Sequence, residues 1–494
     1  MSHDRLGFAV GYKDIADNVF VPRYYDPAVP ERLAQLRASH DLIALGDLLK
    51  SGKLHASTGD EIGKMAYGTG EIPFIRTSDI SNWEIKADPK QGVSREIYAA
   101  YAGKQDVREG DIFFVRDGTY LVGQTCVVTR YDLPCLFQSH ILRLRLSEQP
   151  SFNRFLFLAL LNSPTVKLQI RARQFTADII DTIGNRYREL LLPVPKDPKW
   201  RTDVADETRN VIETRAKLRE AIRKIPLWAQ AIIESVGDPV PELLGQIEKG
   251  EGHPGFLLPY SSVRNSIFVP RYYDHHIDSE LRSLAETHQL VPLSDLIKQK
   301  VISWNTGFEP GKMAYGTGPV PFIRTSDISN WELKSDPKQS VSEELYEQFR
   351  EKQDVEAEDI FVVRDGTYLV GTSCILTEHD TKILYCGGIY KLCVKKKDEL
   401  DPYLLLALLN TPIVRRQMRA KQFTRDIIDT LGKRLFEILL PIPKDPALRQ
   451  RIANETRETV LTRVRLRNRI REIALEVEGL TSIPEEAKEL LETL

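Results

Sequence analysis

The chain of 494 residues carries one long internal repeat, and this duplication constrains its fold more than any other feature. The segment FIRTSDISNWE occurs at Phe74–Glu84 and again at Phe322–Glu332, 248 positions later, and FVPRYYD at Phe20 recurs at Phe268 with the same offset. Solenoid repeats span only about 20–50 residues, whereas a unit of this length can own a hydrophobic core. We therefore expect two tandem copies of one domain.

The residue pattern changes once within each copy, from mixed strand and helix signals to a purely helical pattern, and this change predicts the domain boundaries. The first copy begins with a globular domain at 1–198, followed by a long helix and linker at 199–247. The second copy places its globular domain at 248–446 and its long helix, with an acidic tail, at 447–494. The glycines and proline of EKGEGHPGF favour a linker between the copies.

Short β-branched and aromatic runs separated by turn residues predict strands in the globular domain, namely IPFIRTSDI, GDIFFVRDGTY, QTCVVTR and HILRLRL. The Asp117–Gly118 dipeptide predicts a turn between two of them. FLFLALLNSPTVKLQI is more helical, with a break at NSPT, and LLLPVPKDP ends the domain. The predicted fold class is α+β: two tandem mixed α/β domains, each followed by a long helix.

The long helices carry a seam with alternating spacings of four and three residues, which is the heptad pattern of a coiled coil. The seam consists of Val204, Thr208, Val211, Arg215, Leu218, Ile222 and Ile225 in the first copy, and Ile452, Thr456, Thr459, Arg463, Leu466, Ile470 and Ile473 in the second. One interpretation is two separate surface helices. The other is that the equivalent helices pair with each other as an antiparallel coiled coil.

Familiar catalytic motifs are missing from the sequence. It has no phosphate-binding G-x-x-x-x-G-K-[ST], no H-E-x-x-H and no G-x-S-x-G. Five cysteines without a C-x-x-C pair predict free buried thiols rather than disulfides or zinc ligands. We expect no cofactor, no metal and no catalytic activity. No run approaches the ~20 apolar residues of a membrane span, and the N-terminus lacks a signal-peptide pattern, so we expect a cytoplasmic protein without a membrane partner.

Polar and cationic side chains recur in three loop segments of both copies and are the candidates for DNA contact. Arginine and asparagine can read base edges, while lysine, threonine, serine and tyrosine suit phosphates. The candidates are Lys64, Arg76, Thr77, Ser78, Asn82, Arg116, Thr119 and Tyr120 in the first copy, and Lys312, Arg324, Thr325, Ser326, Asn330, Arg364, Thr367 and Tyr368 in the second.

A structural interpretation stands beside this one. The TSD segment resembles a turn that satisfies its own backbone, with Asp79 and Trp83 holding the loop in shape. Arg76 and Arg116 suit a salt bridge as well as a DNA contact. The net charge of −2 argues against a protein that coats nucleic acid non-specifically, although it permits a localised basic surface.

Taken in order, these motifs resemble the specificity (S) subunit of type I restriction–modification systems. IPFIRTSDI is similar to an early segment of that family, GDIFFVRDGTYLVG to its G-D-I-x-x-x-R-x-G turn, QSHI at Gln138–Ile141 to the following strand entry, and LLLPVPKDP to the exit before the helix. QSHI becomes CGGI at Cys386–Ile389. The resemblance covers nearly the whole chain, in two copies.

The resemblance implies a non-catalytic protein with two target-recognition domains that bind a bipartite site on double-stranded DNA. It also implies two adenine-N6 methyltransferase (M) subunits as partners, often with a restriction/translocase (R) subunit, in a phage-defence complex. Because 20 of 22 residues agree between Gly63–Glu84 and Gly311–Glu332, we expect a nearly palindromic target. The alternatives are a methyltransferase or nuclease with unrecognised motifs, and a two-armed protein scaffold that does not bind DNA.

Overall fold

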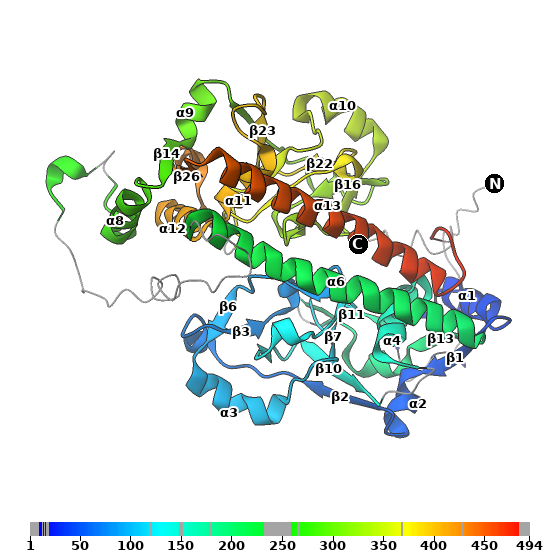
Figure 1. Cartoon of the computed structure of the whole chain (residues 1–494). Helices are drawn as coiled ribbons and strands as arrows, with labels where there is room; N and C mark the ends of the chain where they lie inside the picture. The colour runs from blue at the N-terminus through cyan, green and yellow to red at the C-terminus, as the bar shows by residue number, and fades with distance from the viewer. Residues whose placement is uncertain are drawn as a thin grey trace. The chain divides into compact units, whose positions relative to one another are not determined.

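The computed structural model of the chain describes residues 9–11, 13, 15, 19–118, 121–147, 152–177, 180–231, 258–263, 267–366, 369–425 and 428–483. It divides into two compact units (Figure 1). Unit 1 comprises Met1–Ala216 and Arg467–Leu494, and unit 2 comprises Lys217–Leu466. Each unit therefore contains the globular part of one repeat and the last part of the long helix from the other repeat.

Unit 1 alternates short helices and strands, as the sequence predicts for an α+β domain. Its main elements are α1 (Ala28–Leu36), β1 (His40–Ala44), α2 (Leu45–Lys50), β2 (Leu54–Thr58), η3 (Lys64–Ala66), β3 (Ile72–Ile75), η4 (Thr77–Asp79), β4 (Ile80–Ser81), β5 (Glu84–Ile85), β6 (Gln91–Val93), α3 (Arg95–Gln105), β7 (Ile112–Val115), β8 (Thr125–Val127), β9 (Leu136–Phe137), β10 (Ile141–Leu146), α4 (Arg154–Leu161), α5 (Pro164–Arg173), β11 (Phe175–Ala177), β12 (Ile180–Thr182) and β13 (Leu191–Pro195).

Unit 2 repeats this order. Its main elements are α8 (His275–Leu284), β14 (His288–Pro292), α9 (Leu293–Lys298), β15 (Ile302–Thr306), η9 (Lys312–Ala314), β16 (Val320–Ile323), η10 (Thr325–Asp327), β17 (Ile328–Ser329), β18 (Glu332–Leu333), β19 (Gln339–Val341), α10 (Glu343–Gln353), β20 (Ile360–Val363), β21 (Ser373–Ile375), β22 (Leu384–Tyr385), β23 (Ile389–Val394), α11 (Pro402–Leu409), α12 (Pro412–Lys421), β24 (Phe423–Arg425), β25 (Ile428–Thr430) and β26 (Leu439–Pro443).

An antiparallel four-stranded sheet, ordered β2-β10-β7-β8, forms the centre of unit 1. A second sheet, β6-β3-β9, pairs β3 parallel with β9, so segments far apart in sequence lie side by side. All four residues of β7 are buried, which explains its uninterrupted apolar run. The core between the sheets gathers Ile75, Ile80, Phe113, Val115 and Phe137.

The four strands predicted from the sequence are confirmed as β3, β7, β8 and β10. Asp117 and Gly118 lie in the connection from β7 to its antiparallel neighbour β8, as predicted, but the described turn residues are Leu121–Gly123 and Asp117 bridges to Thr182. FLFLALLNSPTVKLQI forms α4 and α5, broken at Asn162–Ser163 because Pro164 starts the second helix. Four of the five cysteines are buried free thiols, as expected, and Cys393 is half-buried.

The long helices are α6 (Pro198–Ala231) and α13 (Pro446–Glu476). Within unit 1 they run antiparallel: the Trp200 Nε1–H donates to the Glu476 carbonyl over 3.1 Å, and seven residues further along α6 the Arg469 Nε–H donates to Glu207 Oε1 over 2.9 Å. The predicted antiparallel pairing is thus confirmed, and most seam residues are buried, while Leu218 and Leu466 are half-buried. Among the described residues, no helix is long and apolar enough to cross a membrane.

Candidate nucleic-acid interface

The FIRTSDISNWE motif of unit 1 leaves β3 and turns sharply through η4. The Asp79 carboxylate accepts a hydrogen bond from the Arg76 backbone N–H at 2.9 Å and closes the turn. Burial raises the pKa of Asp79, although Lys86 and Arg76 nearby oppose the shift. Trp83 follows with a φ of 61° and is buried. Asp79 and Trp83 therefore shape the turn, in agreement with the structural interpretation of these two residues.

The last residue of the motif binds the long helix of its own repeat. Arg215 Nη2 lies 3.0 Å from Glu84 Oε1, and Arg463 Nη2 lies 3.0 Å from Glu332 Oε1 in unit 2. Both arginines are fully buried. The arginine that interrupts each helix seam is thus the buried partner of the motif, and removing either partner would leave an uncompensated charge.

The GKMAYGTG tips expose a lysine and a methionine in each unit. Lys64 and Lys312 are exposed, and Met65 and Met313 are each 92% exposed. The tip of unit 1 adjoins the motif because the Arg76 guanidinium lies 6.0 Å from the centre of the Tyr67 ring. In unit 2 burial raises the pKa of Tyr315, and the nearby Arg324 opposes that shift.

The predicted DNA-contact residues of the motif differ in exposure. Ser78 and Arg324 are exposed, whereas Arg76, Thr77, Thr325, Ser326 and Asn330 are half-buried. Asn82 is only 3% exposed and has a φ of 50°, which favours a structural role. Burial lowers the pKa of Lys90 to about 7, and Arg76 adds to this shift. The positive charge at this face of unit 1 therefore depends on pH through Lys90.

Arg116 and Asp117 form a close pair at the turn after β7. The Arg116 Nη2 lies 2.7 Å from Asp117 Oδ2, and His140 Nδ1 lies 3.1 Å from the same oxygen. Burial opposes ionisation of Asp117, but hydrogen bonds from Arg116, Thr182 and His140 outweigh it and lower the pKa. Arg364 and Asp365 pair in the same way in unit 2, with Gly388 in place of His140.

The GKMAYGTG tip, the FIRTSDISNWE turn, the turn after β7 and the β11–β12 hairpin meet at this end of unit 1. A Cβ on Gly118 would lie 3.9 Å from Thr77 Oγ1, and the Gly118 N–H donates to the Asp181 carbonyl over 2.8 Å. The β11–β12 hairpin therefore lies against the turn after β7. In unit 2 the Gly366 N–H donates to the Asp429 carbonyl over 2.9 Å. The candidates Thr119, Tyr120, Thr367 and Tyr368 lie outside the described residues.

Two duplicated features of the units escaped prediction from the sequence. At the base of each hairpin an arginine covers an aromatic ring: Arg186 lies 4.5 Å from the centre of the Phe175 ring, and Arg434 lies 4.0 Å from that of Phe423. His40 and His288 are also equivalent, and each ring Nε2 contacts a backbone carbonyl near the end of a long helix, at 3.0 and 2.9 Å. The 248-residue offset alone links the two histidines and could have revealed them.

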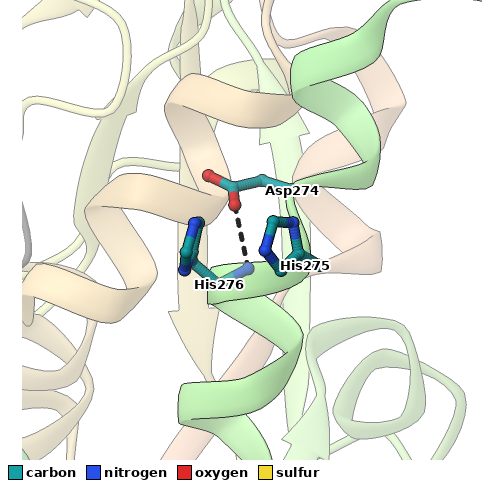
Figure 2. A group of neighbouring side chains, drawn as sticks. All are labelled: Asp274, His275 and His276. Carbon is teal, nitrogen blue, oxygen red and sulfur yellow. Dashed lines mark hydrogen bonds between the residues drawn. The ribbon is translucent and has the colours of Figure 1, made fainter. Parts of the chain in front are cut away.

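Asp274, His275 and His276 form the group of possible metal ligands in the described part of the chain (Figure 2). Their ligand atoms lie within 4.8 Å of one another. The Asp274 carboxylate already accepts a hydrogen bond from the His276 N–H at 3.0 Å and caps α8. Unit 1 has Asp26, Pro27 and Ala28 at these positions. We therefore assign no metal to this group.

Comparison with known proteins finds no matching family model and no matching curated protein. Solved structures do match. The S subunit of a type I restriction–modification system from M. genitalium is similar at 12% identity, with a TM-score of 0.32, over 91% of this chain and 95% of that chain. The HsdS subunit from Thermoanaerobacter tengcongensis is similar at 16% identity, with a TM-score of 0.26, over 92% and 96%.

A shorter match involves the type IIG restriction endonuclease BpuSI, at 11% identity with a TM-score of 0.27. It covers 38% of this chain and 28% of that chain.

Proposed function

We propose that the chain is a sequence-specific DNA-binding subunit of a restriction–modification or related defence complex. One observation carries the proposal: both units present the same loop cluster, with an exposed lysine at the GKMAYGTG tip and an arginine directly after β3 or β16. A cationic rim around hydrogen-bonding side chains is what base readout combined with phosphate contact requires.

The duplication defines the kind of target. Two equivalent readers carried by antiparallel helices demand two equivalent half-sites in inverted orientation. We therefore propose an interrupted, nearly palindromic site on double-stranded DNA. Differences between Lys53–Ile62 and Val301–Pro310 would account for any inequality of the half-sites. The methyl group is transferred by adenine-N6 methyltransferase subunits docked on this chain, and the chain itself supplies no catalytic residue.

Arg76 and Arg324 are the residues on which base recognition depends most in this proposal. Arg116 and Arg364 are weaker candidates because each is already paired with the adjacent aspartate. A bidentate contact from arginine to guanine contributes about 1–3 kcal/mol of discrimination, so losing one such contact in each half-site removes most of the preference for the target.

Methylation mapping in cells that express the chain with its methyltransferase tests the proposal. We expect one interrupted, nearly palindromic methylated sequence, which disappears in the R76A/R324A variant. Arg130→Ala serves as the matched control, because this exposed arginine lies beyond the opposite end of β8. Unrelated half-sites would overturn the symmetric target, and methylation that does not depend on the chain would overturn the function.

Two further measurements separate the alternatives. The purified chain incubated alone with DNA and labelled S-adenosylmethionine, or with Mg²⁺, is expected to show no turnover, whereas a hidden methyltransferase or nuclease would. The second measurement compares sequence-specific DNA binding of the wild type and R76A/R324A. Our proposal expects the variant to lose it, whereas a protein scaffold that never touches DNA would show no difference between the two.

A further inference from the structure

Each unit contains a small docking site that receives a side chain from the end of the long helix of the other repeat. We call the site in unit 1 socket 1. There the Glu478 carboxylate accepts hydrogen bonds from the Thr165 N–H at 2.8 Å and the Thr165 hydroxyl at 2.7 Å, and it pairs with Arg32 at 3.1 Å. The Glu478 side chain is fully buried. Glu478 is the second residue after α13, so socket 1 binds the segment at the end of the second long helix.

Socket 2, in unit 2, occupies the equivalent position with different chemistry. The Gln230 side-chain oxygen accepts a hydrogen bond from the Ile413 N–H at 2.8 Å, and its amide donates to Glu280 Oε1 at 2.6 Å. Glu280 is also paired with Arg416. Gln230 belongs to the last turn of α6 and is 3% exposed.

The repeat offset shows that the charges at two equivalent positions differ between the sockets. Arg32 in socket 1 corresponds to Glu280 in socket 2, and Glu478 corresponds to Gln230. If the end of α13 entered socket 2, the Glu478 carboxylate would face Glu280 at hydrogen-bond distance, and the two carboxylates would share the cation of Arg416, which already pairs with Glu280. Two carboxylates that share one cation in a largely buried site repel each other, because little water remains to screen them.

A second, steric difference protects socket 1 from the end of α6. Gly479, next to Glu478, has a φ of 71°, and a Cβ there would lie 3.2 Å from Cη2 of Trp200. The residue of α6 that corresponds to Gly479 is Ala231, which carries such a Cβ. In socket 2 the position of Trp200 is held by Leu448. Each socket therefore disfavours the wrong helix end by a different mechanism.

We propose that these two sockets determine which helix end docks on which unit. They thereby direct α6 to pair with α13, rather than each helix with the same helix of a second chain. The occupant of socket 1 is a carboxylate followed by glycine, and that of socket 2 is a neutral amide. Two nearly identical repeats would otherwise offer interchangeable docking sites, and chains could associate through two α13 helices. This inference stands independently of DNA binding.

An isosteric cycle at positions 230 and 280 in the full-length chain tests socket 2. Hydrogen–deuterium exchange of the last turn of α6 reports docking, and β7 of unit 1 reports global folding. We expect Q230E to speed exchange of that turn about tenfold. We expect Q230E/E280Q to return to within about twofold of the wild-type rate, because the repulsion is gone. An effect of Q230E that is equal in the wild-type and E280Q backgrounds would overturn the proposal for socket 2.

The matching cycle for socket 1 uses Gly479 and Trp200. We expect G479A to speed exchange at the end of α13, and by less in a W200L background. The strain of alanine at this φ is common to both backgrounds and cancels in the comparison. An effect of G479A that is the same in both backgrounds would show that Trp200 does not discriminate.

Partner choice itself is measured with two differently tagged full-length chains that are unfolded and refolded together. E280Q removes the repulsion that keeps Glu478 out of socket 2, so we expect capture of one tagged chain by the other to rise several-fold over wild type. R130A, which touches neither socket, is the control and should behave as wild type. Equal capture by E280Q and wild type would refute the role of the sockets in partner choice.

Discussion

Arg215 and Glu84 form a buried ion pair, with 3.0 Å between Nη2 and Oε1, and Arg463 and Glu332 repeat it in the other unit. The pair joins FIRTSDISNWE, which is identical in the two repeats, to the seam of the long helix. The glutamate at the end of FIRTSDISNWE thus has a structural reason to recur, separate from any DNA contact. The ion pair therefore holds the motif in a defined position on the long helix of its own repeat.

Substitution of Arg215 by methionine is expected to destabilise unit 1 by about 3–5 kcal/mol, because it leaves the Glu84 charge buried and uncompensated. The R215M/E84L variant should recover much of this loss, since an apolar pair needs no compensation. Urea unfolding of both variants measures the difference. The exposed variant K53A is the control, and equal destabilisation by R215M and R215M/E84L would contradict the prediction.

Lys64→Ala and Lys312→Ala are expected to weaken DNA binding by similar factors for target and non-target sequences. Each lost phosphate contact should lower the slope of log Kd against log salt concentration by about 1. Fluorescence anisotropy over a salt series measures both effects. Lys53→Ala is the matched control, because this exposed lysine lies beyond the opposite end of β10 from the candidate loops. Loss of affinity for the target alone would instead assign these lysines to base recognition.

Acidification is expected to loosen the end of α6 on unit 2 through His288. Burial lowers the pKa of His288 in the folded protein below its ordinary value of 6.5. As the pH falls through about 6.5, the unfolded state binds a proton that the folded state does not, so stability decreases with decreasing pH. The stabilisation is therefore complete above pH 6.5 and is lost below it.

Unfolding free energies at pH 7.5 and 5.5 measure this effect. H288Q, whose amide can still donate to the Ala229 carbonyl, should show a smaller decrease between the two values than wild type. Identical decreases would exclude His288 as the titrating group.

Two glycines of unit 1 are expected to respond to alanine in opposite directions. Gly59→Ala should destabilise by about 1–3 kcal/mol, because its Cβ would lie 2.2 Å from the Phe137 carbonyl oxygen. Gly103→Ala should stabilise by about 0.5–1 kcal/mol, since Gly103 lies inside α3 and a Cβ there would have no atom within 4 Å. Thermal unfolding of the two variants compares them directly, and a destabilised G103A would contradict the prediction.

Local pattern was enough to predict much of this protein. The repeat offset defined two equivalent domains, β-branched and aromatic runs predicted β3, β7, β8 and β10, and heptad spacing predicted two paired helices. These features are readable because periodicity and turn chemistry act over a few neighbouring residues. The positions of the domain boundaries and the DNA-contact residues stay predictions.

Contacts between residues far apart in the chain were decided only by the tertiary structure. The sequence placed an arginine in each seam but could not pair Arg215 with Glu84, 131 positions away. It made Asn82 a base-reading candidate, and the left-handed turn buries it. It could not show that Glu478 closes a site with Thr165. Such pairings depend on how separate elements pack, and burial and charge compensation then select the partner. Local sequence periodicity therefore cannot predict them.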